Sequence, residues 1–235
     1  MIGLELNGAR VAFSTRQGGV SKGPYDSLNL GILTEDDQDR VSENRRRLAA
    51  ALQLDAGRVA MGWQVHGTEL QEWTAPPDRG GYAHAGAELP KVDGHTTTER
   101  KLALLVLTAD CLPVALASPE RIAMLHCGWR GLAAGIIERA TEAFDTPPAA
   151  ALGPCIEQCC YEVGEEVLDA FADIRDAADG RQLSLRTIAR EKLEAAGVSQ
   201  IESIDLCTSC REDLFFSHRR DNGVTGRQAG MIWRK

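Results

Sequence analysis

Two residues whose side chains can bind a metal or act as a nucleophile and a base, Cys111 and His126, flank a pair of short apolar runs in the stretch LTADCLPVALASPERIAMLHCGWRG. The runs, Val114–Ala117 and Ile122–His126, are separated by four residues, which is the pattern of a β-hairpin. An aspartate directly precedes the cysteine. A thiolate and an imidazole at the same end of one hairpin can converge on a metal ion or on a substrate atom.

The hairpin pairing decides which of these side chains meet. If Ala117 pairs with Ile122, Cys111 lies opposite Gly128 and His126 lies opposite Pro113. Because side chains alternate between the two faces of a strand, Cys111 and His126 then share one face as diagonal neighbours. Cys127 points to the other face, where we expect a buried small side chain.

A third candidate ligand, His66, stands in the stretch WQVHG, where it follows the apolar run Val59–Val65 that we predict to be a strand. Two histidines and one cysteine suit Zn²⁺, and a fourth position left to water is the catalytic arrangement. Copper accepts similar ligands. The spacing of the three residues contains no short metal-binding signature, so the prediction depends on the fold bringing them together.

A candidate anion site follows the hairpin. Gly128 and Gly131 flank Trp129 and Arg130 directly before a predicted helix. The beginning of a helix offers free backbone N–H groups and the positive end of its dipole. Arg130 would strengthen anion binding there, although a plain turn between a strand and a helix has the same pattern.

The elements that must position these residues are short apolar strands interleaved with helices. This pattern predicts an α/β or α+β fold, in which residues 1–235 form a single layered domain with a mixed β-sheet and flanking helices. We predict strands over Val11–Ser14, Val59–Val65, Leu102–Thr108, Val114–Ala117, Ile122–His126, Ile201–Leu206 and Ala229–Trp233. We predict helices over Val41–Leu54, Leu132–Phe144 and Glu165–Ala172, and a fourth with Ser184 as its N-cap and an end at Gly197. The glycine- and proline-rich stretch Pro76–Gly94 is predicted to be a long surface loop.

Composition excludes several classes of protein. The chain has 235 residues, a net charge of −8 and 43% hydrophobic residues, which is typical of a soluble protein with a substantial core. The acidic balance argues against nucleic acid as the main partner. No apolar run approaches the roughly 20 residues of a membrane span, and the first residues lack the pattern of a secretory signal. The seven cysteines are best interpreted as reduced thiols, and we expect a cytoplasmic protein.

A series of ordered motifs spans nearly the whole chain: FSTRQGGVSKGPYDSLNLG, ENRRRL, QVHG, VDG, TADCLPV, HCGWRGL, LGPCIEQCCYEVGEEV, CT, FFSHRRD and TGRQAGMIW. In these motifs the sequence resembles the YfiH-like family, also called the multicopper polyphenol oxidase (laccase) or purine nucleoside phosphorylase family. The resemblance implies a cytoplasmic enzyme that cleaves adenosine, inosine, guanosine and S-methyl-5′-thioadenosine with inorganic phosphate and also deaminates adenosine. The family's catalytic and metal-binding residues map onto His66, Cys111 and His126.

This activity needs an anion pocket for phosphate and a surface for the purine. The stretches STR and SHRRDNGVTGRQ combine hydroxyl groups with guanidinium groups, a mixture suited to oxyanions. An aromatic residue in CCYEV or FFSHRR would stack on the base. The candidate phosphate ligands are Arg16, Arg130, Arg219 and Arg227, and the candidate stacking residues are Tyr161 and Phe216, for which core packing is the alternative.

Two other enzymes remain possible with the same residues. In a cysteine-dependent hydrolase, Cys111 is the nucleophile and His126 or His66 is its base. A laccase-like polyphenol oxidase is the other, but a multicopper oxidase needs many histidines, often in His-x-His pairs. The chain has five histidines and no such pair, so it can build at most one mononuclear site.

Further alternatives are zinc sites of other kinds and a protein that binds nucleosides without catalysis. Cys207 and Cys210 form a Cys-x-x-Cys pair that could bind a structural zinc ion. The other two ligands would come from Cys155, Cys159 and Cys160, but the CIEQCC spacing fits a zinc signature poorly. A cytidine-deaminase zinc site is excluded, because no histidine is followed two positions later by glutamate. A non-enzymatic nucleoside-binding module is distinguished from an enzyme by the absence of turnover.

Overall fold

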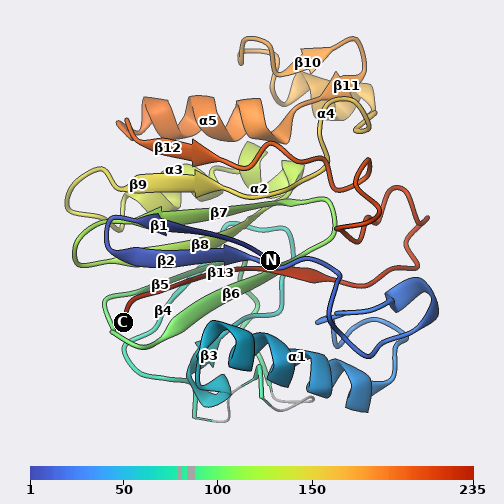
Figure 1. The fold of residues 1–235 in the computed structure, drawn as a ribbon. Helices are drawn as coiled ribbons and strands as arrows, with labels where there is room; N and C mark the ends of the chain where they lie inside the picture. Colours follow the sequence, from blue (N-terminus) through green and yellow to red (C-terminus); the bar gives the residue numbers. More distant parts are fainter. Residues whose placement is uncertain (79–80, 84–87) are drawn as a thin grey trace.

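The computed structural model describes residues 1–78, 81–83 and 88–235, and the chain folds into alternating layers of helices and sheets. Figure 1 shows α5 toward the top of the view and α1 at the bottom, with the strands of the two sheets between them. The predicted mixed α/β architecture is therefore confirmed. The loop predicted over Pro76–Gly94 contains residues 79–80 and 84–87, which lie outside the described residues. None of the helices in the described ranges is long and apolar enough to cross a bilayer.

Two mixed sheets form the centre of the described structure. One has the order β1-β2-β13-β6-β3 and the other β12-β9-β7-β8-β5-β4. The first consists of β1 (Ile2–Leu6), β2 (Ala9–Phe13), β13 (Gln228–Trp233), β6 (Ala103–Thr108) and β3 (Val59–Ala60). The second consists of β12 (Ile201–Ser203), β9 (Ala149–Leu152), β7 (Leu112–Ala117), β8 (Ile122–Cys127), β5 (Gly94–Thr97) and β4 (Leu70–Glu72). A separate small ribbon pairs β10 (Ala178–Asp179) with β11 (Gln182–Leu183).

The strands β6, β7 and β8 are buried on both faces, and their alternating side chains divide the core into layers. From β7 and β8, Leu116 and Leu125 pack against the helices, whereas Ala115 and Met124 pack against the other sheet. Val106 of β6 lies in that same layer between the sheets. Double burial explains why these strands are continuous apolar runs in the sequence.

The helices of the described residues are α1 (Gln38–Leu52), α2 (Trp129–Ala133), α3 (Ile136–Thr141), α4 (Glu165–Asp169) and α5 (Leu185–Ala195), with two short 3₁₀ turns, η1 (Gly23–Tyr25) and η2 (Ala56–Arg58). The N-cap predicted for α5 is confirmed, because the Ser184 hydroxyl accepts the Thr187 N–H at 3.1 Å. Gly197 has a φ of 84° just beyond the end of this helix.

Several predicted elements were wrong in their extent. The helix predicted over Leu132–Phe144 is two helices, because Gly135 adopts a φ of 93° between α2 and α3. The strand predicted over Val59–Val65 ends at Ala60. The strand predicted over Ile201–Leu206 ends at Ser203, and the helix predicted from Glu165 to Ala172 ends at Asp169. Several short strands were not predicted at all, namely β1, β4, β5, β9, β10 and β11.

Candidate functional site

His66, Cys111 and His126 meet at the open end of the β7–β8 hairpin. Their ligand atoms all lie within 4.8 Å of one another, and the Cys111 Sγ is 3.9 Å from the His66 Nε2. The predicted register is confirmed: Ala117 pairs with Ile122 and Pro113 pairs with His126. Cys127 is fully buried in the layer beneath the helices, on the face away from the site, as predicted.

His66 reaches this site from a loop, not from the end of a strand. Its backbone has a φ of 61°, a conformation that residues other than glycine rarely adopt. The Asp93 carboxylate holds the loop, because it accepts the backbone N–H groups of Val65, His66 and Gly67 at 3.0, 2.9 and 2.8 Å. This buried carboxylate compensates for the strained backbone and holds the backbone of His66 in place.

The same carboxylate orients the second histidine. Asp93 Oδ1 lies 2.7 Å from the His126 Nδ1, and both side chains are buried. Burial opposes ionisation of Asp93, but the hydrogen bonds from His126, Gly67 and Val65 outweigh it and lower the pKa of the carboxyl. Because Nδ1 then donates its proton to Asp93, the His126 Nε2 is turned toward Cys111 and His66.

Without a metal, Cys111 and His126 form a charged pair. Burial opposes the thiolate, but His126 and His66 together lower the pKa of Cys111 to about 6. Burial likewise opposes the imidazolium, but the Cys111 sulfur and Asp93 raise the pKa of His126 to about 9. The site therefore favours a thiolate beside an imidazolium at neutral pH.

Gly128 makes room for the cluster. A Cβ atom at this position would lie 2.9 Å from the His66 Cδ2 and 3.3 Å from the Cys111 Sγ. Gly128 is also the N-cap residue of α2, so the helix begins at Trp129 and includes Arg130 and Gly131, earlier than predicted. The close approach of both side chains explains the glycine here.

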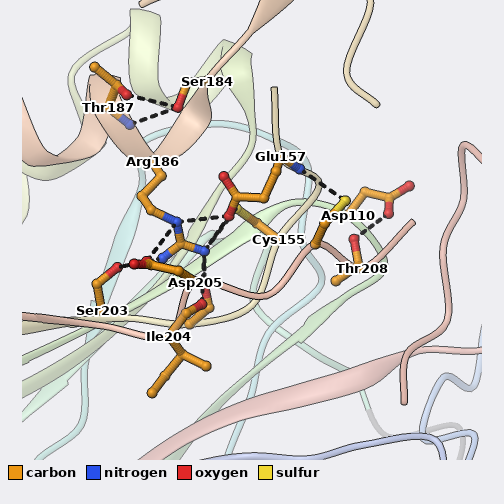
Figure 2. A network of polar contacts seen from close by, with 12 residues as sticks. Asp110, Cys155, Glu157, Ser184, Arg186, Thr187, Ser203, Ile204, Asp205 and Thr208 are labelled. Carbon is orange, nitrogen blue, oxygen red and sulfur yellow. Dashed lines mark hydrogen bonds and ion pairs between the residues drawn. The ribbon is translucent and has the colours of Figure 1, made fainter. Parts of the chain in front are cut away.

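Asp110 presents Cys111 from a tight turn with a φ of 91°. Its carboxylate accepts the Thr208 hydroxyl at 2.6 Å and the backbone N–H of Arg219 at 2.7 Å. Figure 2 shows Thr208 directed at Asp110. The turn that carries the thiol is thereby tied to the C-terminal third of the chain.

The donors of the cluster fit a zinc ion. Tetrahedral zinc with Zn–S and Zn–N distances of about 2.3 and 2.0 Å separates sulfur from nitrogen by roughly 3.5 Å, close to the 3.9 Å between Cys111 and His66. Asp93 behind His126 supplies the carboxylate that usually supports a metal-binding histidine. His66 is exposed and His126 is buried, so one side of the cluster is open to solvent.

A cavity of about 320 Å³ opens onto the three residues. Its wall is largely apolar with a few polar side chains, as in most small-molecule sites. His218 and Arg227 line it together with the three cluster residues. The remaining lining residues are Gly31, Ile32, Leu33, Thr34, Met61, Gly62, Trp63, Gln64, Leu89, Leu107, Thr108 and Ala109.

The other predicted ligands lie elsewhere. Arg130, Arg219 and Tyr161 line a separate, open recess of about 310 Å³, and the Arg219 guanidinium stacks 5.2 Å from the centre of the Tyr161 ring. Arg16 lines neither recess; it donates to the carbonyls of Asp26 and Glu212 at 2.6 and 3.3 Å. Phe216 is fully buried beneath the guanidinium of Arg16, which fits core packing and not base stacking.

Sequence reasoning assigned no role to Asp93 or His218. Asp93 stands in the motif VDG, and its signal was an acidic residue between two turn-forming stretches just before β5. His218 stands in FFSHRRD, a motif in which the neighbouring Arg219 was predicted as a phosphate ligand instead. Both reach the site through contacts between segments that are distant in the sequence, which periodicity cannot reveal.

Comparison with known proteins agrees with the observed fold and shows the family of the chain. Residues 10–235 match the family model described as multi-copper polyphenol oxidoreductase laccase. The purine nucleoside phosphorylase YlmD of Geobacillus stearothermophilus is 38% identical over 97% of this chain and 91% of its own length. The purine nucleoside phosphorylase YfiH of Escherichia coli is 40% identical over 96% of this chain and 94% of its own. The crystal structure of the Geobacillus YlmD superimposes with a TM-score of 0.91 over 98% of this chain and 93% of that one. The chain therefore belongs to the YlmD/YfiH family.

Proposed function

We propose that the chain is a purine nucleoside phosphorylase that works as a single domain over residues 1–235. The observation that carries the proposal is the convergence of His66, Cys111 and His126 on a cavity that also contains Arg227. A volume of about 320 Å³ lies within the usual range for small-molecule sites. The relatives named purine nucleoside phosphorylase support this activity, and adenosine, inosine, guanosine and S-methyl-5′-thioadenosine are the proposed substrates.

In this reaction a phosphate oxygen forms a bond to C1′ of the ribose while the bond from C1′ to the purine nitrogen breaks. The electron pair of that bond leaves with the purine, which takes up a proton, and ribose 1-phosphate is released. Arg227 lines the cavity and is the proposed phosphate ligand, and His218, which lines the same cavity, is the proposed proton donor. Arg130, Arg219 and Tyr161 in the neighbouring recess are the alternative phosphate ligands.

His66, Cys111 and His126 would hold a zinc ion, with copper as the alternative. When bound, the metal supplies a Lewis acid that stabilises negative charge and activates water. Asp93 keeps His126 in the tautomer whose Nε2 faces the cluster, and it keeps the His66 loop in place. The same site supports the proposed side activity on adenosine, in which water replaces the amino group and ammonia is released.

Inosine tests the main reaction directly. The purified protein should release hypoxanthine and ribose 1-phosphate when phosphate is present, and neither product when phosphate is omitted. Hypoxanthine with free ribose in both samples would indicate hydrolysis and contradict phosphorolysis. Adenosine without phosphate should give inosine and ammonia; adenosine left unchanged removes the deaminase activity from the proposal.

A cysteine-dependent hydrolase is the second candidate, favoured by the arrangement of Asp93, His126 and Cys111. A thiol beside an imidazole that a carboxylate orients is the pattern of an activated nucleophile. The discriminating measurement is the mass of Cys111 in metal-free protein quenched during turnover. A substrate fragment covalently attached to Cys111 supports the hydrolase, whereas full activity after zinc loading with an unmodified thiol supports the phosphorylase.

The laccase activity in the family description is a weaker candidate for this chain. Only five histidines are present in the sequence, too few for the several copper ions of a multicopper oxidase. Oxidation of a polyphenol by copper-loaded protein is the assay for it. We further propose a cytoplasmic location, because all seven cysteines are free thiols and a reducing compartment keeps them so.

A further inference from the structure

A second cluster of metal-binding side chains lies away from the cavity. Cys159 and Cys160 come from the loop between β9 and α4, and Cys207 and Cys210 come from the loop after β12. All four sulfur atoms lie within 4.8 Å of one another. Two segments about 50 residues apart in the sequence thus contribute two thiols each to one cluster.

The distances between the sulfur atoms match tetrahedral metal coordination. The Sγ of Cys210 is 3.5 Å from that of Cys159 and 3.3 Å from that of Cys160, and the latter two are 3.7 Å apart. Four thiolates at about 2.3 Å from a zinc ion are separated by roughly 3.8 Å. A disulfide joins two sulfur atoms at about 2.05 Å and would leave the other two thiols without a role.

The loops are held together independently of the thiols. Cys155 and Cys207 pair as an isolated β-bridge, and the Thr208 N–H donates to the Cys155 carbonyl at 2.9 Å. Arg186 of α5 joins the loops, donating to the Glu157 carboxylate at 2.8 Å and to the Ile204 carbonyl at 3.0 Å (Figure 2). The four cysteines therefore lie on a preformed scaffold.

The environment of the sulfur atoms suits a bound metal. The backbone N–H of Glu157 donates to the Cys207 Sγ at 3.4 Å, a hydrogen bond that stabilises a thiolate ligand. Cys207 is buried, whereas Cys159 and Cys210 are exposed, which leaves a path for the ion to enter. Cys155 is not part of the cluster, since its sulfur lies against Glu157 and Arg186 at 3.5 and 3.6 Å.

We propose that Cys159, Cys160, Cys207 and Cys210 bind one zinc ion in a closed structural site. Four thiolates are the ligand set of structural zinc, and they leave no open position for catalysis. The ion would hold the two loops together behind the turn that carries Cys111. Thr208, between two of the ligands, bonds to Asp110, and the Ile156 N–H donates to the Asp110 carbonyl at 2.8 Å. This site does not depend on the proposed activity.

Metal analysis of variants tests the proposal on full-length protein purified with a reductant and supplied with Zn²⁺. Cys111→Ala removes a ligand of the cavity site, so any zinc that this variant keeps must lie elsewhere. We expect Cys111→Ala to retain one zinc per chain and Cys111→Ala/Cys210→Ser to retain none. Cys111→Ala/Cys155→Ser is the matched control, which changes a cysteine of the same loops outside the cluster and should retain one. Zinc-free Cys111→Ala protein, or equal zinc in all three, overturns the proposal.

Cobalt distinguishes the ligands without relying on stoichiometry. Co²⁺ added to metal-free Cys111→Ala protein should give the sulfur-to-cobalt charge-transfer and visible bands of a tetrahedral thiolate site, and Cys159→Ser in that background should weaken or abolish them. Loss of zinc from Cys111→Ala protein should also lower its melting temperature and release four thiols to a thiol reagent. A disulfide between Cys160 and Cys210 in the reduced, zinc-supplied protein, found by peptide mass mapping, would contradict the site.

Discussion

The Asp93 carboxylate lies 2.7 Å from the His126 Nδ1, and it also accepts the backbone N–H of His66 at 2.9 Å. One buried side chain thus fixes both histidines of the site, one through its ring and the other through its backbone. Asp93 is fully buried, and its backbone carbonyl accepts the His126 N–H at 2.7 Å. The two residues are bonded through side chain and main chain, which holds the imidazole in a single orientation.

Asp93→Asn should therefore disturb the whole site. The amide nitrogen of asparagine would face at least one N–H donor, and the loss of charge removes the stabilisation of the His126 proton. We expect a loss of roughly 2–3 kcal/mol in the free energy of unfolding, the usual scale for buried hydrogen bonds to a charged group. Zinc affinity at the cavity should fall about 10–100-fold. Thermal melts and competition with a zinc chelator measure the two effects, and unchanged values in both would contradict the role given to Asp93.

Cys111→Ala and Cys127→Ala form a matched pair, because both cysteines flank the same hairpin and only one shares a face with His126. Cys111→Ala should abolish phosphorolysis of inosine, lower the zinc content by one equivalent relative to the unmodified chain and leave the fold intact. Cys127→Ala should keep the activity and the zinc, and lose about 1 kcal/mol of stability from trimming a buried side chain. Equal losses of activity at matched melting temperatures would refute the assignment by strand faces. Retained activity in Cys111→Ala would remove the thiol from the catalytic site.

The sequence was sufficient to predict the hairpin and its register because β7 and β8 are buried on both faces. A four-residue connection between two apolar runs left one favourable pairing, and strand alternation then placed Cys111, His126 and Cys127 correctly. The N-cap Ser184 was likewise local information. Family motifs independently indicated the same three site residues.

The rest depends on contacts that the sequence does not show locally. His66 reaches the site because Asp93 stabilises its left-handed backbone, not because a strand ends there. Arg16 and Arg227 belong to similar polar motifs, yet only Arg227 lines the cavity. The sequence leaves a structural zinc site of Cys207 and Cys210 with Cys155, Cys159 and Cys160 open as an alternative that the CIEQCC spacing fits poorly. The structure brings Cys159, Cys160, Cys207 and Cys210 together because a β-bridge joins the two loops, a contact that the spacing does not reveal.

The pH dependence of metal-free protein follows from two opposite shifts. The pKa of Cys111 is lowered from 9.0 to about 6, so its contribution to stability is present at high pH and is lost as the pH falls through about 6. The pKa of His126 is raised from 6.5 to about 9, so its contribution is present at low pH and is lost as the pH rises through about 9. Between about pH 6.5 and pH 9 the pH dependences of stability from these two residues cancel, because folding moves a proton from Cys111 to His126 without net proton uptake.

Alkylation of Cys111 by iodoacetamide in chelator-treated protein measures this pair. The rate should reach half its maximum near pH 6, since only the thiolate reacts. His126→Ala removes the neighbouring cation and should move that midpoint upward toward the ordinary thiol value, with His66 as the remaining partner. A midpoint in the unmodified site that already equals the ordinary value would show that no such pair forms.

Substitution of the arginines identifies which recess binds phosphate. Arg227→Met should raise the KM for phosphate at least about tenfold, because one charge-assisted hydrogen bond contributes roughly 1.5–3 kcal/mol. Arg46→Met on the exposed face of α1 is the control and should leave this KM unchanged. If Arg130→Met or Arg219→Met raises the KM and Arg227→Met does not, phosphate binds in the neighbouring recess. Initial rates at varied phosphate and saturating inosine provide the comparison.

Gly128→Ala tests the packing of the site without removing any functional group. The added methyl would lie 2.9 Å from the His66 ring and 3.3 Å from the Cys111 sulfur, so one of these side chains must move. The backbone φ of −81° suits alanine, and the strain is therefore confined to the site. Gly3→Ala in the edge strand β1 is the control, because its added methyl would meet only the Val11 carbonyl oxygen, at an ordinary contact distance of 3.7 Å. We expect Gly128→Ala to lose most of its phosphorolysis and to bind zinc more weakly at the cavity, with a melting temperature close to that of the control. Full activity in Gly128→Ala would mean that the three side chains need not approach as closely as they do here for the reaction to proceed.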